Sequence, residues 1–199
     1  MPGTLLAYDE AFPRAAHSSL TVVNHPSLGE LQANSYPAPH QLLPLRREHP
    51  ASEYISTIHH NMRAMHRVNC LILFGHGHVA RLLDATGIIP ITTGIVLGSQ
   101  DLGADNVRLL RRLRDGFAPR GKCELWVCNA ANPNRAQSNS GSSLCQSIAD
   151  ALNVEVVAPA ETQSYRSEGQ EFEGDTVRST VVFLPFEGNV FHFRPNAHH

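Results

Sequence analysis

Two apolar runs in this sequence lead into residues that can take part in nucleophilic chemistry. The run "LILFGHGH" reaches His76, which stands between two glycines, and the run "ELWVCNA" carries Cys128. A thiol beside an imidazole is a minimal nucleophile and base, because the thiolate attacks and the histidine transfers the proton. Gly77 has no side chain to block a substrate, and its N–H is suited to stabilise a developing oxyanion. We therefore expect His76 and Cys128 to form a catalytic pair.

Such a pair requires two neighbouring strands that end at the same edge of a sheet. Short apolar runs predict buried strands at "NCLILFG" (69–75), "KCELWVCNA" (122–130) and "VEVVAPA" (154–160). Strands that alternate with helices predict a mainly parallel sheet with helices on both faces. Functional groups collect beyond the carboxyl ends of parallel strands. The sequence therefore predicts an α/β fold that brings His76 and Cys128 together.

Helical patterns occur at 52–68, 104–116 and 143–153. In the second segment, Val107, Leu110 and Leu113 form an apolar stripe and the arginines form the outer face. The third segment begins with a capping-box pattern, Ser143 to Gln146. These helices are expected to connect the parallel strands.

The two ends of the chain have a different character. The first fifty residues are rich in proline, and only "SLTVVN" (19–24) is typical of a strand there. We therefore divide the chain into an N-terminal arm (1–50) and a catalytic domain (51–199). Between the apolar blocks, "GIIPITTGIVLGS" predicts two short strands around Pro90, which form a hairpin or an excursion from the sheet. The segment "STVVFLPFEGNVFHFRP" (179–195) predicts a C-terminal β-hairpin that turns at 187–189.

The order of these blocks resembles that of the caspase-like cysteine peptidases, which include caspases, gingipains, legumains, separases and self-cleaving toxin domains. The resemblance covers roughly residues 69–160. Within it, "LILFGHG" looks like the histidine block, "ELWVCNA" like the cysteine block, and "GSSLCQSIADALNVEVVAPA" like the helix and strand that follow. The glycine-bearing segment "IVLGSQDL" between the blocks is similar to that of bacterial members. The resemblance implies a three-layer α/β/α fold with a mainly parallel sheet.

The resemblance also implies roles for individual residues. His76 becomes the general acid and base, Cys128 the nucleophile, and the amides of Gly77 and Cys128 the oxyanion hole. The implied activity is hydrolysis of peptide bonds in a protein substrate or in the chain itself, without a cofactor. The sequence departs from the family at Val127, where a small or acidic residue often precedes the cysteine. His78 is a second histidine that can take the place of His76.

Specificity in this family depends on the strand after the cysteine and on the loop beyond it. Here that loop is "AETQSYRSEGQEFEGD" (160–175), which holds Glu161 and further acids together with Arg166. Carboxylates such as Glu161 select Lys or Arg in a substrate, whereas Arg166 selects Asp or Glu. The sequence leaves these two alternatives open.

Composition excludes several other functions. The chain has 199 residues, 42% of them hydrophobic, and a formal net charge of -2, which argues against broad nucleic-acid binding. No apolar run approaches the roughly 20 residues of a membrane span. We expect a cytoplasmic protein, or one secreted without a signal peptide. Its other cysteines, Cys70, Cys123 and Cys145, are interpreted as reduced core thiols.

Two alternatives to a peptidase remain open, and a third is disfavoured. His76, His78 and Cys128 are also a plausible zinc ligand set, although the peptidase hypothesis includes no metal. A caspase-like module can bind proteins without cleaving them. An α/β-hydrolase is disfavoured because neither G-x-S-x-G nor G-x-C-x-G occurs around a strand end.

Overall fold

The computed structural model describes residues 3–9, 18–23, 40–84, 87–132, 141–161, 165–173, 176–183, 186 and 188–196. At its centre is a six-stranded sheet in the order β12-β9-β8-β4-β1-β3. Its strands are β1 (Gly3–Asp9), β3 (His40–Leu45), β4 (Val68–Phe74), β8 (Phe117–Trp126), β9 (Glu155–Pro159) and β12 (Val190–Phe193). All neighbours run parallel except β12, which is antiparallel to β9. The predicted α/β fold with a mainly parallel sheet is confirmed.

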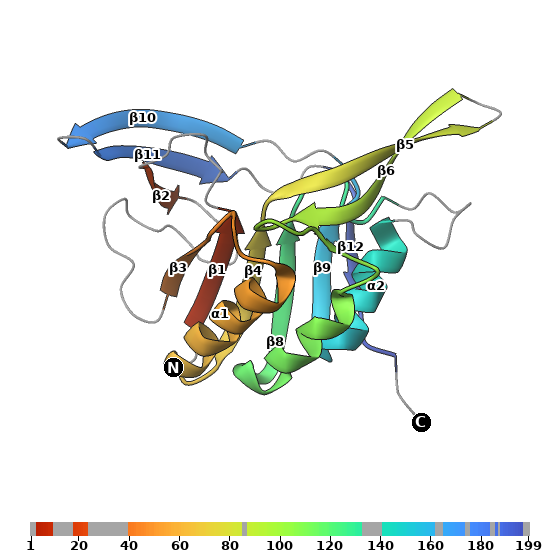
Figure 1. The fold of residues 1–199 in the computed structure, drawn as a ribbon, viewed down its shortest axis with the longest axis horizontal. Coiled ribbons are helices and arrows are strands. Elements are labelled where there is room, and N and C mark those ends of the chain that lie inside the picture. Colours follow the sequence, from red (N-terminus) through yellow and green to blue (C-terminus); the bar gives the residue numbers. More distant parts are fainter. Residues whose placement is uncertain are drawn as a thin grey trace.

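Three helices form one layer on a single face of this sheet (Figure 1). They are α1 (Ala51–Ala64), the 3₁₀ helix η1 (Val107–Gly116) and α2 (Gly141–Leu152), and η1 packs between the other two. The described part of the chain has no helix on the opposite face, so the second helical layer stays a prediction. None of the described helices is long and apolar enough to cross a membrane.

The helices differ in detail from the sequence patterns. In η1, Leu110 and Leu113 are buried and Val107 is half-buried. Their spacing of three residues matches the period of a 3₁₀ helix. Helix α2 begins at Gly141, so the capping box predicted from Ser143 to Gln146 is wrong. The Gln146 amide instead donates to Asp150 Oδ1 at 3.0 Å.

Two small sheets lie beyond the carboxyl ends of the central strands (Figure 1). One consists of β5 (His76–Asp84), β6 (Gly87–Val96) and β7 (Leu102–Gly103), and the other of β10 (Tyr165–Glu173), β11 (Thr176–Phe183) and β2 (Ser18–Val23). The two short strands predicted around Pro90 are wrong, because 87–96 is the single strand β6, which contains Pro90 and pairs with β5. The hairpin predicted over 179–195 is wrong, because β11 pairs with β10 and β2 whereas β12 pairs with β9. The strand predicted at 19–24 is β2.

The N-terminal region is not an arm attached to a separate domain. Strand β1 lies between β4 and β3 in the central sheet, and all seven of its residues are buried. Strand β3 is the edge strand of that sheet, which explains how it tolerates Pro44. The predicted boundary at residue 50 is therefore corrected: residues on both sides of it build one sheet.

The main core lies between the sheet and the helical layer. Alternate residues of each strand face the helices, for example Leu5, Leu71, Leu73 and Leu125, because side chains alternate across a strand. The opposite face is also packed: the Trp126 ring stacks on Phe186 with centroids 4.4 Å apart. Burial on both faces accounts for the continuous apolar runs of the parallel strands.

A substitution in β1 tests its place in the core. Leu5 is fully buried in the cluster that faces the helices. We expect Leu5→Ala to lower the free energy of unfolding by about 2–5 kcal/mol in a urea titration, because it leaves a cavity. The half-buried Leu109 is the matched control, and Leu109→Ala should cost clearly less. Equal small losses for both variants would contradict a central β1.

Candidate active site

The segment before His76 is shaped by one close backbone contact. Gly75 follows the end of β4 and is buried, and a Cβ placed on it would lie 2.6 Å from the Val96 carbonyl oxygen. Real Cβ atoms essentially never come so close, so this position requires glycine. The chain then continues directly into β5 with His76 opposite Val96. Gly75 therefore allows the hairpin that carries His76 to start at the end of β4.

The neighbouring strand brings Cys128 to the same edge. Strands β4 and β8 pair in parallel, and their last paired residues are Phe74 and Trp126. His76 and Cys128 each come two residues after these partners. Adjacent parallel strands lie about 4.8 Å apart. The backbone therefore brings both residues to one edge, at matching positions of adjacent strands.

The turn that carries Cys128 is held by backbone hydrogen bonds. The Asn129 N–H donates to the Glu161 carbonyl at 2.9 Å, and the Ala131 N–H donates to the Pro159 carbonyl at 2.8 Å. Asn129 has a φ of 55°, a left-handed conformation that asparagine tolerates better than most residues. These contacts fix the turn against the end of β9 and bring Glu161 next to it.

The other predicted substrate and oxyanion residues have less defined positions. The Glu161 side chain is exposed, beside the Cys128 turn. Arg166 lies in β10 opposite Val182, and its side chain falls outside the described residues. Gly77 lies opposite Ile95 in the ladder between β5 and β6, so its role as an oxyanion donor stays a prediction.

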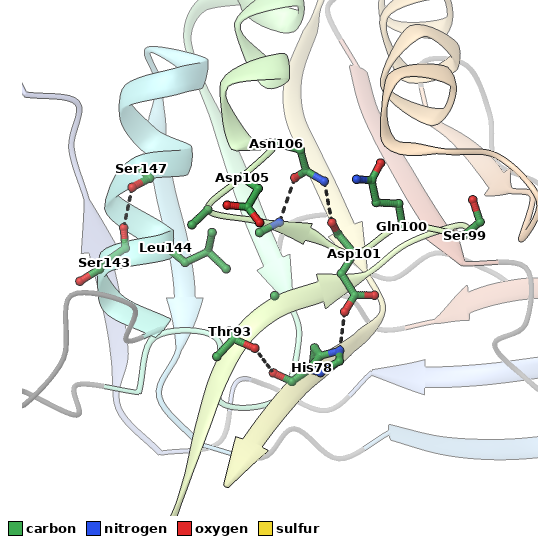
Figure 2. Close-up of a pocket in the computed structure, with 13 residues that line it drawn as sticks. His78, Thr93, Ser99, Gln100, Asp101, Asp105, Asn106, Ser143, Leu144 and Ser147 are labelled. Carbon is green, nitrogen blue, oxygen red and sulfur yellow. Dashed lines mark hydrogen bonds and ion pairs between the residues drawn. The ribbon is translucent and has the colours of Figure 1, made fainter. Parts of the chain in front are cut away.

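An acidic partner for His78 is a feature that the sequence did not indicate. His78 Nδ1 forms an ion pair with Asp101 Oδ2, and both residues line a pocket of about 620 Å³ (Figure 2). The backbone of Asp101 is held by Asn106, whose amide donates to the Asp101 carbonyl at 2.7 Å. Carboxylates commonly orient catalytic imidazoles. Asp101 lies in "IVLGSQDL", but no sequence pattern links it to His78.

The four thiols fall into two groups. Cys70, Cys123 and Cys145 are buried, and burial is the main cause that raises the pKa of each. The Cys145 thiol donates to the Ala130 carbonyl at 3.1 Å, which makes it part of the support beneath the Cys128 turn. Cys128 is only half-buried. A reagent must reach the sulfur, so Cys128 is the thiol best placed to react.

The structure offers no support for the zinc alternative. No group of three or more His, Cys, Asp or Glu side chains able to hold a metal ion occurs within the described residues. His76, His78 and Cys128 are therefore not assembled as a ligand set there. Searches against family models, curated proteins and solved structures found no match to this chain.

The close contact at Gly75 is testable by a single added methyl group. Gly75→Ala should lower the free energy of unfolding by about 1–3 kcal/mol in a denaturant titration, because the β6 backbone must move. In Gly103→Ala the new Cβ would lie 3.3 Å from the Thr93 carbonyl oxygen, a contact that a small shift relieves. This control should lose less stability. Equal losses would argue against a special constraint at Gly75.

Thiol reactivity is the second test of the site. In the folded protein at pH 7.5, brief treatment with iodoacetamide should label Cys128 at least about tenfold faster than any other cysteine, because only this thiol is not buried. Mass spectrometry of peptides identifies the labelled residue. Labelling in guanidinium, where all four thiols are exposed, serves as the control. Comparable labelling of Cys70 in the folded protein would contradict the assignment.

Proposed function

We propose that this protein is a cysteine endopeptidase that uses His76 and Cys128. One observation carries the proposal: the parallel pairing of β4 with β8 ends at Phe74 and Trp126, two residues before His76 and Cys128. Cys128 is half-buried whereas the other three thiols are buried, which supports the same assignment. The caspase-like three-layer fold is part of this proposal. It is supported by the order of the histidine strand, helix, cysteine strand, helix and following strand along the chain.

The proposed reaction has two steps. His76 takes the proton of the Cys128 thiol, and the sulfur attacks the carbonyl carbon of the scissile peptide bond. The amides of Gly77 and Cys128 stabilise the oxyanion. The protonated imidazole then gives its proton to the departing amine, which leaves a thioester. In the second step, His76 takes a proton from water, the hydroxide attacks the thioester, and the carboxylic acid leaves as the proton returns to sulfur.

His78 is a second candidate for the imidazole. Its ion pair with Asp101 is the kind of contact that fixes the orientation of a catalytic histidine. In this variant of the mechanism Cys128 remains the nucleophile, and Asp101 is a positioning residue. Glu161 is the candidate for substrate selection, since its backbone is hydrogen-bonded to the Cys128 turn. It favours substrates with Lys or Arg, whereas Arg166, the other candidate, favours substrates with Asp or Glu.

A cleavage profile of cell lysate tests the proposal. Wild type should generate new protein termini, and Cys128→Ala should reduce their rate of formation by about 10³-fold or more, because it removes the nucleophile. Sequencing of the new termini identifies the substrate residue that is preferred at the cleaved bond. A preference for Lys or Arg would assign substrate selection to Glu161, and a preference for Asp or Glu would assign it to Arg166. Variants His76→Ala and His78→Ala identify the imidazole, and only one of them should match the loss in Cys128→Ala.

Two controls make this experiment decisive. The exposed His60 on α1 is a matched histidine, and His60→Ala should cleave like wild type. If His78 is the base, Asp101→Asn should lower kcat with little change in KM. Identical termini from wild type and Cys128→Ala would overturn the peptidase proposal. Retained capture of the same partners by Cys128→Ala would then favour a protein-binding module.

A further inference from the structure

Four arginines surround a depression at the amino edge of the central sheet. Arg67 directly precedes β4, Arg114 lies on η1, Arg120 belongs to the first part of β8, and Arg194 follows β12. They line a space of about 700 Å³ together with Asn153 and other residues. This edge is opposite to the one that carries His76 and Cys128. The inference drawn from it does not depend on the proposed peptidase activity.

The charge of this depression is strongly positive for a chain with a net charge of -2. Glu155 is the only carboxylate among the described residues that line it. That carboxylate is already shared, since Glu155 Oε1 lies 3.3 Å from His192 Nδ1 and 3.8 Å from Arg194 Nε. The described lining therefore contains four arginines and one acid, which leaves an excess of positive charge.

One of these arginines is held rigidly. The Arg114 Nε donates to the Ala151 carbonyl and its Nη2 donates to the Asp150 carbonyl, both at 2.8 Å. These bonds satisfy carbonyls at the end of α2 and use only part of the five N–H donors of a guanidinium. Arg67 and Arg120 have exposed side chains, and no ion pair is formed by either within the described residues. The depression thus combines one fixed guanidinium with two uncommitted ones.

The backbone at the two uncommitted arginines is unusual. Arg67 has a φ of 82° and Arg120 a φ of 63°, both in the left-handed region that glycine or asparagine normally occupies. Arg67 closes the end of α1 through a hydrogen bond from its N–H to the Met62 carbonyl at 3.0 Å. Arg120 lies in a bulge of β8, where residues 118–121 stand opposite Asn69 alone. A residue kept in a backbone conformation that is unfavourable for its type points to a function of its side chain.

We propose that this depression binds a small molecule that carries two or more phosphate groups. Guanidinium groups match phosphate oxygens with paired hydrogen bonds, and several arginines converging on one space favour several phosphates over one. A compact depression, rather than a long basic stripe, fits a small molecule better than a nucleic acid. Binding is expected to stabilise the folded chain by mass action.

The test uses tripolyphosphate as the probe and a variant designed to keep the fold. The double variant Arg67→Asn/Arg120→Asn removes both charges but suits the left-handed backbone. Wild type should bind tripolyphosphate in calorimetry and unfold at a higher temperature in its presence. The double variant should bind at least about tenfold more weakly, because two charge-assisted contacts are lost. Without the probe, it should unfold at the same or a higher temperature than wild type.

A matched control separates this site from general charge effects. Arg46→Asn/Arg47→Asn removes two exposed arginines that follow β3 at the opposite edge of the sheet and do not line the depression. It should bind tripolyphosphate within about twofold of wild type, since the loss of distant charges is screened. Equal weakening in both double variants, or equal stabilisation of wild type by sulfate at the same ionic strength, would overturn the proposal. Binding of single-stranded DNA through Arg67 and Arg120, with no binding of tripolyphosphate, would overturn it as well.

Discussion

The parallel register between β4 and β8 is the constraint on which the arrangement of the candidate site depends. These strands are neighbours at the centre of the sheet, buried between the helical layer and the packing around Trp126. A slip of one residue would turn every side chain of a strand to the other face. The core that fixes this register therefore also fixes His76 relative to Cys128.

The sequence was sufficient for the elements with a continuous apolar signal. It predicted β4, β8 and β9 and their parallel pairing, because strands buried on both faces have few polar positions. It did not predict β1, whose apolar run Leu5–Leu6–Ala7 is short and lies in a proline-rich region. It also assigned β11 and β12 to one hairpin, because proximity along the chain says nothing about which sheet a strand joins.

The candidate site shows the same division. His76 and Cys128 follow buried strands, so the sequence was enough to single them out. Asp101 meets His78 only because β6 and β7 fold back on β5, and that contact depends on the whole hairpin. The sequence shows a glycine at position 75, but it does not show why a larger residue cannot stand there. The reason is the Val96 carbonyl oxygen, which comes from another strand.

Left-handed backbone occurs at both edges of the sheet. At the carboxyl edge the position after Cys128 is Asn129, a residue that adopts this conformation readily. At the amino edge the left-handed positions are His66, Arg67, Arg120 and Asn153. Histidine and asparagine tolerate this conformation better than arginine does. The left-handed conformation costs a residue such as arginine roughly 1–2 kcal/mol, a cost that glycine would avoid. Backbone geometry therefore explains Asn129 but not the two arginines, so their side chains need a reason outside the fold. An anion held among the four guanidinium groups supplies one.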